Sequence, residues 1–455
     1  MALGAAAPPS TTAGVWRCLE NIRRHDGLLK AMITVLEEDA LREAAALDEA
    51  ASGGDTRGLL HGMPVTLKDV IDTAGVRTTS GSKFFEHHVP AVDAEVVRRL
   101  KANGAVIIGK VNLHEFAYGG TTQNPFYGRC RNPWNPDCIP GGSSGGSGAA
   151  AAAEMCIASL GTDTGGSGRI PGALNGIAAL RPTVGRISNR GVTPVSQPFD
   201  TLSPMAYRVT DVARVFAAIA GYDPSDPISV DRSVENFLPG LGEGIGGVRI
   251  GLPRAFFFEE VEADVLAPAR AAIDVLERLG AQVVAIDVPG AAEAKDQFEK
   301  IFHTDCADFH RQRFATEREK FGKDTAERLA MGTERKGIDY AAGMRWMEAW
   351  RRRLALVFGE VDIVASPATP VAAPPIAESE QTTAVTRRLT RFCYPWSIAG
   401  TPVLVVPCGF NRAGLPVGLS LAAAWWQEPL LFRVGVAYQA ATDWHTRRPP
   451  LLGAA

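Results

Sequence analysis

Twice along the chain, a segment with helical spacing of its apolar residues ends at a glycine and is followed by a short apolar run. The first unit pairs residues 93–103 with the run 105–109, and the second pairs residues 264–279 with the run 282–288. An apolar run of this length is typical of a strand buried on both faces of a sheet. Helices that alternate with such strands predict an α/β fold in layers.

Other segments extend this pattern. Residues 62–67 predict a strand that delivers Lys68 and Asp69, and further strands are predicted at 361–365, 403–406 and 417–421. Lys110 follows another apolar run and is expected near the surface. Residues 1–14 are expected to fray, and 28–50 predict one helix that stops at Ser52-Gly53-Gly54. The charged stretch 302–358 predicts a helical insert or lid. We therefore expect a helical N-terminal segment (1–60) and one catalytic domain (61–455).

The overall composition excludes several classes of protein. The 455 residues carry 47 Lys and Arg against 50 Asp and Glu, a net charge of −3, and 46% are hydrophobic. An acidic disordered chain would be less apolar, and a nucleic-acid binder would be more basic, so no nucleic-acid partner is expected. No apolar stretch reaches the length of about 20 residues that spans a bilayer, so no membrane association is expected.

Seven cysteines, an odd number with no CxxC pair, speak against a disulfide framework and favour a reducing, cytoplasmic location. The histidines show no metal-binding spacing, so no metal site is expected.

Two Gly-Gly-Ser loops, 24 residues apart, form the most informative segment. The stretch between them, 149–158, is rich in alanine and predicts a tightly packed helix. Glycine lets a substrate approach the main chain, and successive glycine amides can point at one oxyanion. A serine hydroxyl becomes a nucleophile only when a base takes its proton. No histidine lies near either loop in the sequence, whereas Lys68 ends an apolar strand where burial could make its amine neutral. The pattern therefore indicates a Ser–Ser–Lys proton relay.

The two loops read Gly141-Gly142-Ser143-Ser144-Gly145-Gly146-Ser147 and Gly161-Thr162-Asp163-Thr164-Gly165-Gly166-Ser167-x-Arg169-Ile170-Pro171. Together with segments 64–69, 109–116, 132–134, 181–186 and 414–418, they resemble the amidase signature family. The resemblance implies a mixed, twisted β-sheet covered by helices on both faces, and no cofactor. It also implies that Lys68 is the base, Ser143 the bridging serine on a cis peptide, and Ser167 the acylated nucleophile.

The resemblance assigns supporting roles to the residues around the relay. The main-chain amides of Thr164, Gly165, Gly166 and Ser167 would form the oxyanion hole. Ser144 would support the relay, and Asp163 and Arg169 would act as scaffolding that holds the loop backbone. Tyr118, Gln123, Phe392 and Trp396 stand in segments that resemble pocket-lining parts of the family. Two positions depart from it, because members often have isoleucine at Gly168 and glutamate at Gln123.

We therefore expect a serine amidohydrolase that cleaves a carbon–nitrogen bond of a small amide through a Ser167 acyl-enzyme. The aromatic segment 392–396 favours an apolar or aromatic amide or a carbamate, with esterase or urethanase side activity. The sequence leaves a homodimer open.

One alternative is the glutamine-hydrolysing A subunit of a tRNA-dependent amidotransferase. That branch pairs the glutamine ammonium with an Asp before an Ala-Gly-x-Pro stretch, where this chain has Thr390 or Arg391. The other alternative is an inactive binding scaffold, which the presence of all three relay residues disfavours.

Four other interpretations of glycine-rich motifs are disfavoured. The sequence Gly141-x-Ser143-x-Gly145 fits a nucleophile elbow, but no strand precedes it. The run 104–110 lacks the Ser or Thr of a P-loop, and 242–247 precedes a strand instead of following one. A flexible linker would not need the Thr-Asp and Arg-Ile-Pro residues that flank the second loop.

Overall fold

The computed structural model describes residues 10–380 and 382–453. Its strands are β1 (Met32–Val35), β2 (Pro64–Lys68), β3 (Val106–Val111), β4 (Gln123–Asn124), β5 (Gly128–Arg129), β6 (Ala158–Thr162), β7 (Ala178–Arg181), β8 (Leu202–Ala206), β9 (Arg249–Pro253), β10 (Gln282–Ile286), β11 (Ile363–Pro367), β12 (Val403–Phe410) and β13 (Pro416–Ala423). Eleven of them form one sheet in the order β1-β3-β2-β6-β8-β7-β12-β13-β11-β9-β10, while β4 and β5 pair separately.

The sheet is mixed, as predicted. Strand β2 runs parallel to both β3 and β6, and β9 runs parallel to β10 and β11, whereas the strands between these groups pair in antiparallel fashion. Because β2 and β6 run in the same direction, Lys68 and Thr162, the last residues of the two strands, emerge at one edge of the sheet.

Helices cover both faces of the sheet, which confirms the predicted α/β architecture. They are α1 (Thr11–Leu29), α2 (Glu37–Ser52), α3 (Glu95–Ala102), α4 (Gly145–Ala152), α5 (Arg169–Asn175), α6 (Val209–Ile219), α7 (Ala263–Arg278), α8 (Ala294–Thr316), α9 (Lys323–Thr333), α10 (Gly337–Glu360), α11 (Thr382–Thr390), α12 (Tyr394–Ala399) and α13 (Glu428–Ala440). Strand β3 shows why both faces must be covered: Ile107 packs in one core with α3 and α6, while Val106 and Ile108 pack in another with α1, α2 and α4.

Near the N-terminus the structure differs from the prediction. Residues 11–14, expected to fray, begin α1, and residues 1–9 lie outside the described part of the chain. The single helix predicted for 28–50 is instead the end of α1, the strand β1 and α2. The Asp26 carboxylate accepts hydrogen bonds from the amides of Ala31 and Met32, and β1 then pairs with β3. These contacts are tertiary, so helical spacing of the apolar residues could not reveal them.

Helix α4 begins at Gly145, earlier than the predicted start at 149, and residue 158 already belongs to β6. Glycine is required in this first turn because the helix backbone passes close to the main chain of Asn112. A Cβ atom at Gly146 would lie 2.2 Å from the main-chain oxygen of Asn112, just beyond β3. The first turn of α4 therefore packs directly against the sheet edge where Lys68 emerges.

Lys110 is fully buried, so the prediction of a surface lysine is wrong. Its Nζ lies 3.1 Å from Asp69 Oδ1 and donates to the Ile71 carbonyl and the Thr78 hydroxyl. The buried carboxylate of Asp69 offsets the cost of burying the charge.

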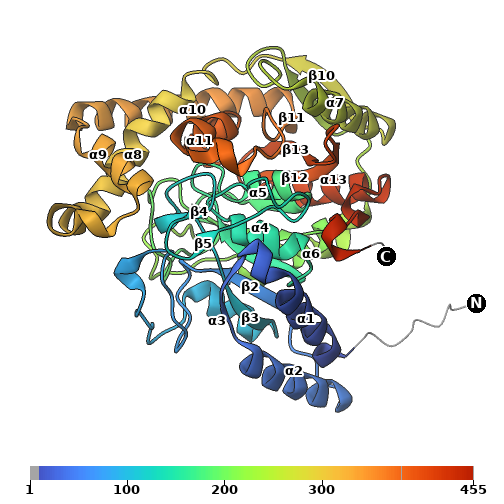
Figure 1. Cartoon of the computed structure of the whole chain (residues 1–455). Coiled ribbons are helices and arrows are strands. Elements are labelled where there is room, and N and C mark those ends of the chain that lie inside the picture. Colours follow the sequence, from blue (N-terminus) through green and yellow to red (C-terminus); the bar gives the residue numbers. More distant parts are fainter. Residues whose placement is uncertain (1–9, 381, 454–455) are drawn as a thin grey trace, which may run out of the picture.

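The predicted helical insert is formed by α8, α9 and α10, which extend the expected range 302–358 to 294–360. Figure 1 shows these helices together at one side of the molecule, far from α1 and α2. Helix α8 packs on α9, α10 and α12. Within the described residues, no helix combines the length and apolarity needed to cross a membrane.

Candidate active site

Lys68 is the centre of the candidate relay. Its side chain has no solvent-exposed surface, and Nζ lies 2.6 Å from Ser143 Oγ, 2.7 Å from Thr162 Oγ1 and 3.0 Å from Ser144 Oγ. Burial lowers the pKa of the Lys68 amine to about 7, although Asp163 and Asp200 favour its charged form. A large fraction of the amine is therefore neutral near neutral pH, as a general base requires.

The hydroxyls around Lys68 differ in what they can donate. A neutral amine has two hydrogens to donate and one lone pair to accept, which matches three surrounding hydroxyls. Ser144 Oγ donates to the Thr162 carbonyl at 3.0 Å, so its proton is already committed. Ser143 is the hydroxyl nearest to Nζ, and its proton can pass to the Lys68 lone pair.

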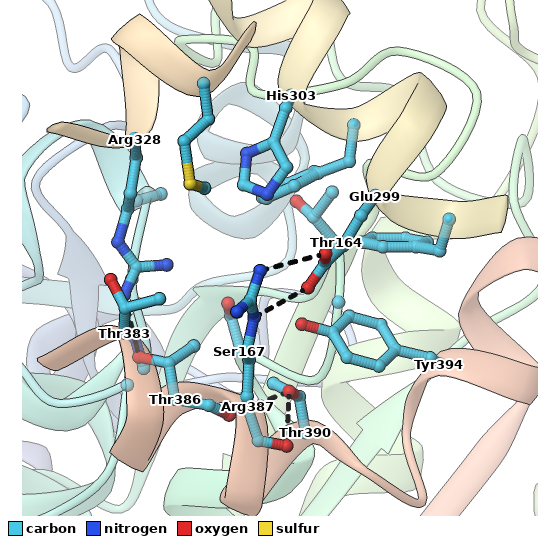
Figure 2. Close-up of a pocket in the computed structure, with 18 residues that line it drawn as sticks. Thr164, Ser167, Glu299, His303, Arg328, Thr383, Thr386, Arg387, Thr390 and Tyr394 are labelled. Carbon is cyan, nitrogen blue, oxygen red and sulfur yellow. Dashed lines mark hydrogen bonds and ion pairs between the residues drawn. The ribbon is translucent and has the colours of Figure 1, made fainter. Parts of the chain in front are cut away.

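The two Gly-Gly-Ser loops lie against each other. The amide of Ser144 donates to the Ser167 carbonyl at 3.2 Å, and the peptide bond between Gly142 and Ser143 is cis, as the family resemblance implies. Ser167 is partly exposed and, with Gly142, lines a cavity. Figure 2 shows Ser167 and Thr164 among the residues that line this cavity. The structure therefore brings Lys68, Ser143 and the Ser167 loop into one region.

The amides predicted for the oxyanion hole are not all available. The Gly166 amide donates to Asp163 Oδ1 at 2.9 Å, so it is occupied. The amides of Thr164, Gly165 and Ser167 donate to no acceptor among residues 10–380 and 382–453. These three are the candidate donors to a substrate oxyanion.

Asp163 and Arg169 form the scaffold of the nucleophile loop. Asp163 accepts hydrogen bonds from the main-chain amides of Gly166, Gly168 and Arg169 and pairs with two buried guanidiniums, those of Arg169 at 2.9 Å and Arg181 at 3.2 Å. Burial alone would raise the pKa of Asp163, but the two arginines hold it well below its usual value. Asp163 is therefore an anion that shapes the loop.

We expect Asp163→Asn to destabilise the protein by about 3–5 kcal/mol, because it leaves two buried arginines without their counter-ion. Chemical denaturation measures this loss. The matched control is Asp443→Asn, which removes an exposed pair with Arg447 and should change stability by less than about 1 kcal/mol. Equal stability of the two variants would show that the buried triad is not structural.

Gly168, one of the two departures from the family pattern, has a structural reason. A Cβ atom there would lie 1.9 Å from Ser203 Oγ on β8, whose hydroxyl donates to the Leu180 carbonyl. Ser203 occupies the space that a larger side chain at 168 would need.

The cavity beside Ser167 is lined mainly by the helical insert and α11. Its lining residues are Ala117, Gly119, Gly120, Gly142, Thr164, Gly165, Ser167, Phe298, Glu299, Phe302, His303, Arg328, Met331, Thr383, Thr386, Arg387, Thr390 and Tyr394. Among the residues that the structure describes, none of the four side chains expected to bind substrate belongs to this lining.

Those four side chains have other contacts. Tyr118 is buried behind the cavity wall, where its hydroxyl bonds to His303 and donates to the Arg328 carbonyl. Gln123 donates to the carbonyls of Thr121 and Cys130. Phe392 and Trp396 are buried against Phe257.

Charged residues that no sequence motif singled out dominate one wall of the cavity. Glu299 on α8 pairs with Arg387 on α11 through two contacts of 3.1 Å, drawn as dashed lines in Figure 2. Arg328 on α9 is nearly buried, and Asp324 and Thr386 orient its guanidinium. No local pattern marks these residues, since they come from three helices that meet only in the fold.

Residues 10–380 and 382–453 contain no cluster of three or more His, Cys, Asp or Glu side chains arranged to hold a metal ion.

Comparisons with known proteins agree with this geometry. The model of the Amidase family matches residues 14–432. The A subunit of glutamyl-tRNA(Gln) amidotransferase from Roseiflexus sp. is 41% identical, over 93% of this chain and 91% of that protein. A solved structure described as a vestigial complex revealing the evolutionary origins of an s-triazine catabolic enzyme is 34% identical with a TM-score of 0.90, covering 95% of each chain.

The peptide amidase of Stenotrophomonas maltophilia is 31% identical with a TM-score of 0.85, over 98% of this chain and 96% of that one. The match extends over nearly the whole chain, and the chain belongs to the Amidase family, the amidase signature hydrolases that act on carbon–nitrogen bonds.

Proposed function

We propose that this protein hydrolyses the carboxamide of glutamine, or of a similarly small amide that carries a carboxylate, through an acyl-enzyme on Ser167. The observation that supports it is the cavity at Ser167, whose wall combines the guanidiniums of Arg328 and Arg387 with the carboxylate of Glu299. A wall with this charge suits a zwitterionic or anionic substrate better than the apolar or aromatic one expected from the sequence.

We infer the reaction from the contact between Lys68 and Ser143 and from the position of Ser167 on the neighbouring loop. Ser167 Oγ attacks the amide carbon while its proton passes to Ser143 Oγ and the Ser143 proton passes to Lys68 Nζ. The amides of Thr164, Gly165 and Ser167 stabilise the oxyanion. The relay then returns a proton to the leaving nitrogen, which departs as ammonia. Water, deprotonated through the same relay, cleaves the ester to release the carboxylic acid and restore Ser167.

The charges of the cavity assign a role to each end of an amino-acid amide. Glu299 is nearly buried and has lone pairs beyond those used by Arg387, so it can accept from an α-ammonium group. Arg328 and Arg387 can donate to the α-carboxylate. The carboxamide at the other end of the substrate can then reach Ser167, which lines the same cavity.

The curated relatives support glutamine as the substrate to test first, since those at 35–41% identity are named as the A subunit of glutamyl-tRNA(Gln) amidotransferase. In that role, this chain would release ammonia for a partner that amidates a tRNA-bound amino acid. The test is ammonia release from glutamine by the chain alone and with the proteins that co-purify with it. No release in either preparation would contradict the proposal.

We expect Glu299→Gln to raise the KM for glutamine about 10-fold, because it removes a charge-assisted hydrogen bond to the ammonium. The KM for glutaramate, which has the same carboxamide and carboxylate but no ammonium, should stay within about threefold of wild type.

The matched control is Glu262→Gln, which neutralises an exposed glutamate paired with Arg388 outside the cavity. This control should leave both KM values unchanged. An equal rise for glutamine and glutaramate in Glu299→Gln would show that Glu299 does not bind the ammonium.

A second candidate is a stand-alone amidase that acts on a small carboxylated amide without an ammonium group. Thr390, one of the two residues that align with the aspartate of the amidotransferase branch, lines the cavity and donates its hydroxyl to the Thr386 carbonyl. Arg391 instead pairs with Glu260, an exposed glutamate. Comparing glutamine with a panel of primary amides, anilides, carbamates and p-nitrophenyl esters separates the two candidates. Under the second candidate, glutamine would be a poor substrate.

A further inference from the structure

A segment next to β8 holds the nucleophile loop at two successive residues. The Thr201 carbonyl accepts the amide of Asp163 at 2.8 Å, and Asp200 Oδ1 accepts the hydroxyl of Thr164 at 2.6 Å. Thr164 lies between the end of β6 and the start of α5, outside regular secondary structure. Its hydroxyl is therefore one of the few groups that can fix the orientation of its peptide.

Asp200 is itself held independently of the nucleophile loop. Its second carboxylate oxygen accepts the amides of Val195 at 2.8 Å and Ser196 at 3.0 Å, and its carbonyl accepts the Asn189 side chain at 3.0 Å. An acceptor fixed by three other contacts can impose a position on the donor that it binds.

Thr164 also lines two cavities. One is the cavity at Ser167, and the second is lined by Thr162, Thr164, Asn189, Val195, Asp200 and other residues. Space behind Thr164 means that packing alone does not hold it in place. Arg181 donates to the carbonyls of Asp163 and Thr164, which belong to the two peptides that carry the Thr164 and Gly165 amides. The Asp200 contact is therefore a second anchor, and without it the two peptides could tilt about the Arg181 contacts and turn their amides away from the substrate.

We propose that Asp200 is a positioning residue for amide hydrolysis, which through the Thr164 hydroxyl aims the free amides of Thr164 and Gly165 at the substrate oxyanion. The contribution is to the transition state and the tetrahedral intermediate, because the bound substrate carries no oxyanion. Substrate binding should depend on it little.

The test is Thr164→Val, which keeps the shape of the side chain and removes the hydroxyl. We expect kcat to fall about 10²-fold, the size of the loss for one misplaced oxyanion donor, while KM changes by less than about threefold. Thr164→Ser keeps the hydroxyl and should stay within about threefold of wild-type kcat. The rate of labelling by a fluorophosphonate, which also needs the oxyanion amides, gives the same comparison without a known substrate.

Asp200→Ala and the double variant Thr164→Val/Asp200→Ala complete a double-mutant cycle with Thr164→Val. Asp200→Ala should lower kcat as Thr164→Val does, and the double variant should lose no more than either single one. If Asp200→Ala fails to fold in a thermal melt, the pair Thr164→Val and Thr164→Ser decides alone. A kcat within threefold of wild type for Thr164→Val, or a loss that falls on KM, would overturn the inference. The relay itself is tested separately at Ser167, so Thr164→Val can fail while the proposed function stands.

Discussion

Replacing Ser167 with alanine is expected to lower kcat by about 10⁶-fold, the scale seen when a serine nucleophile is removed from a comparable relay. The variant keeps the cavity, the candidate oxyanion amides and the Asp163 scaffold, but the acyl-enzyme cannot form. Hydrolysis of the best substrate of the amide panel measures the loss. Intact-protein mass after fluorophosphonate treatment should show one adduct on the wild-type chain and none on the variant.

Ser147 provides the matched control for this experiment. It also follows two glycines, in Gly145-Gly146-Ser147, so it shares the local Gly-Gly-Ser pattern of Ser167. The structure buries it in α4, and its hydroxyl has no hydrogen-bond partner among the described residues. Ser147→Ala should therefore keep both activity and labelling. An active Ser167→Ala enzyme, or labelling lost in Ser147→Ala instead, would refute the assignment.

The sequence was most informative where a feature depends on neighbours along the chain. The run 105–109 is apolar throughout because β3 packs on helices at both faces, and the stop at Gly104 marks the end of the preceding helix region. The strand predicted for 62–67 is β2, which ends at Lys68, and Lys68 is buried there as the pattern predicted. Where a tertiary contact determines the backbone conformation, local patterns fail. The hydrogen bonds of Asp26 before β1 are such a contact, and the sequence pattern there predicted a helix in place of a strand.

The substrate cavity could not be predicted in this way. Glu299, Arg328 and Arg387 are separated by 29 and 59 residues and lie on helices whose surfaces read as ordinary solvated faces. The ion pair between Glu299 and Arg387 and the hydrogen bond from Arg328 to Thr386 form only when α8, α9 and α11 meet at the cavity. The aromatic segment 392–396 was misleading for a related reason, since aromatic side chains are more often core than binding surface.

Replacing Lys68 with methionine is expected to lower kcat by about 10⁴-fold, because it removes the amine that contacts Ser143 Oγ and takes its proton. The wild-type enzyme should gain activity with rising pH and follow an apparent pKa of about 7, the value that burial gives the Lys68 amine. This acid limb should be absent from the residual activity of Lys68→Met. A wild-type profile that is flat between about pH 5 and 10 would contradict a lysine base.

The same burial also makes the stability of the protein depend on pH, in the same direction as its activity. The Lys68 pKa is lowered from 10.5 to about 7 in the folded protein, so between these values the unfolded chain binds a proton that the folded chain does not. Stability should therefore rise with pH across this window, by about 1.4 kcal/mol per unit, and protonating Lys68 at lower pH costs the folded state about 5 kcal/mol. Urea denaturation at about pH 7.5 and about pH 9.5 should show this rise in wild type and not in Lys68→Met, which should be no less stable at the lower pH.

Lys110→Met is the matched control for that measurement, since it removes a second buried lysine from the neighbouring strand β3. Lys110 pairs with Asp69, so its loss leaves a buried carboxylate unpaired and should destabilise the protein by about 3–5 kcal/mol. The two lysines thus separate catalysis from stability. Lys68, surrounded by hydroxyls, is needed for the reaction and lowers stability, whereas Lys110, paired with Asp69, raises stability. If the pH dependence of stability were the same in wild type and Lys68→Met, Lys68 would be charged in the folded protein and could not act as the base.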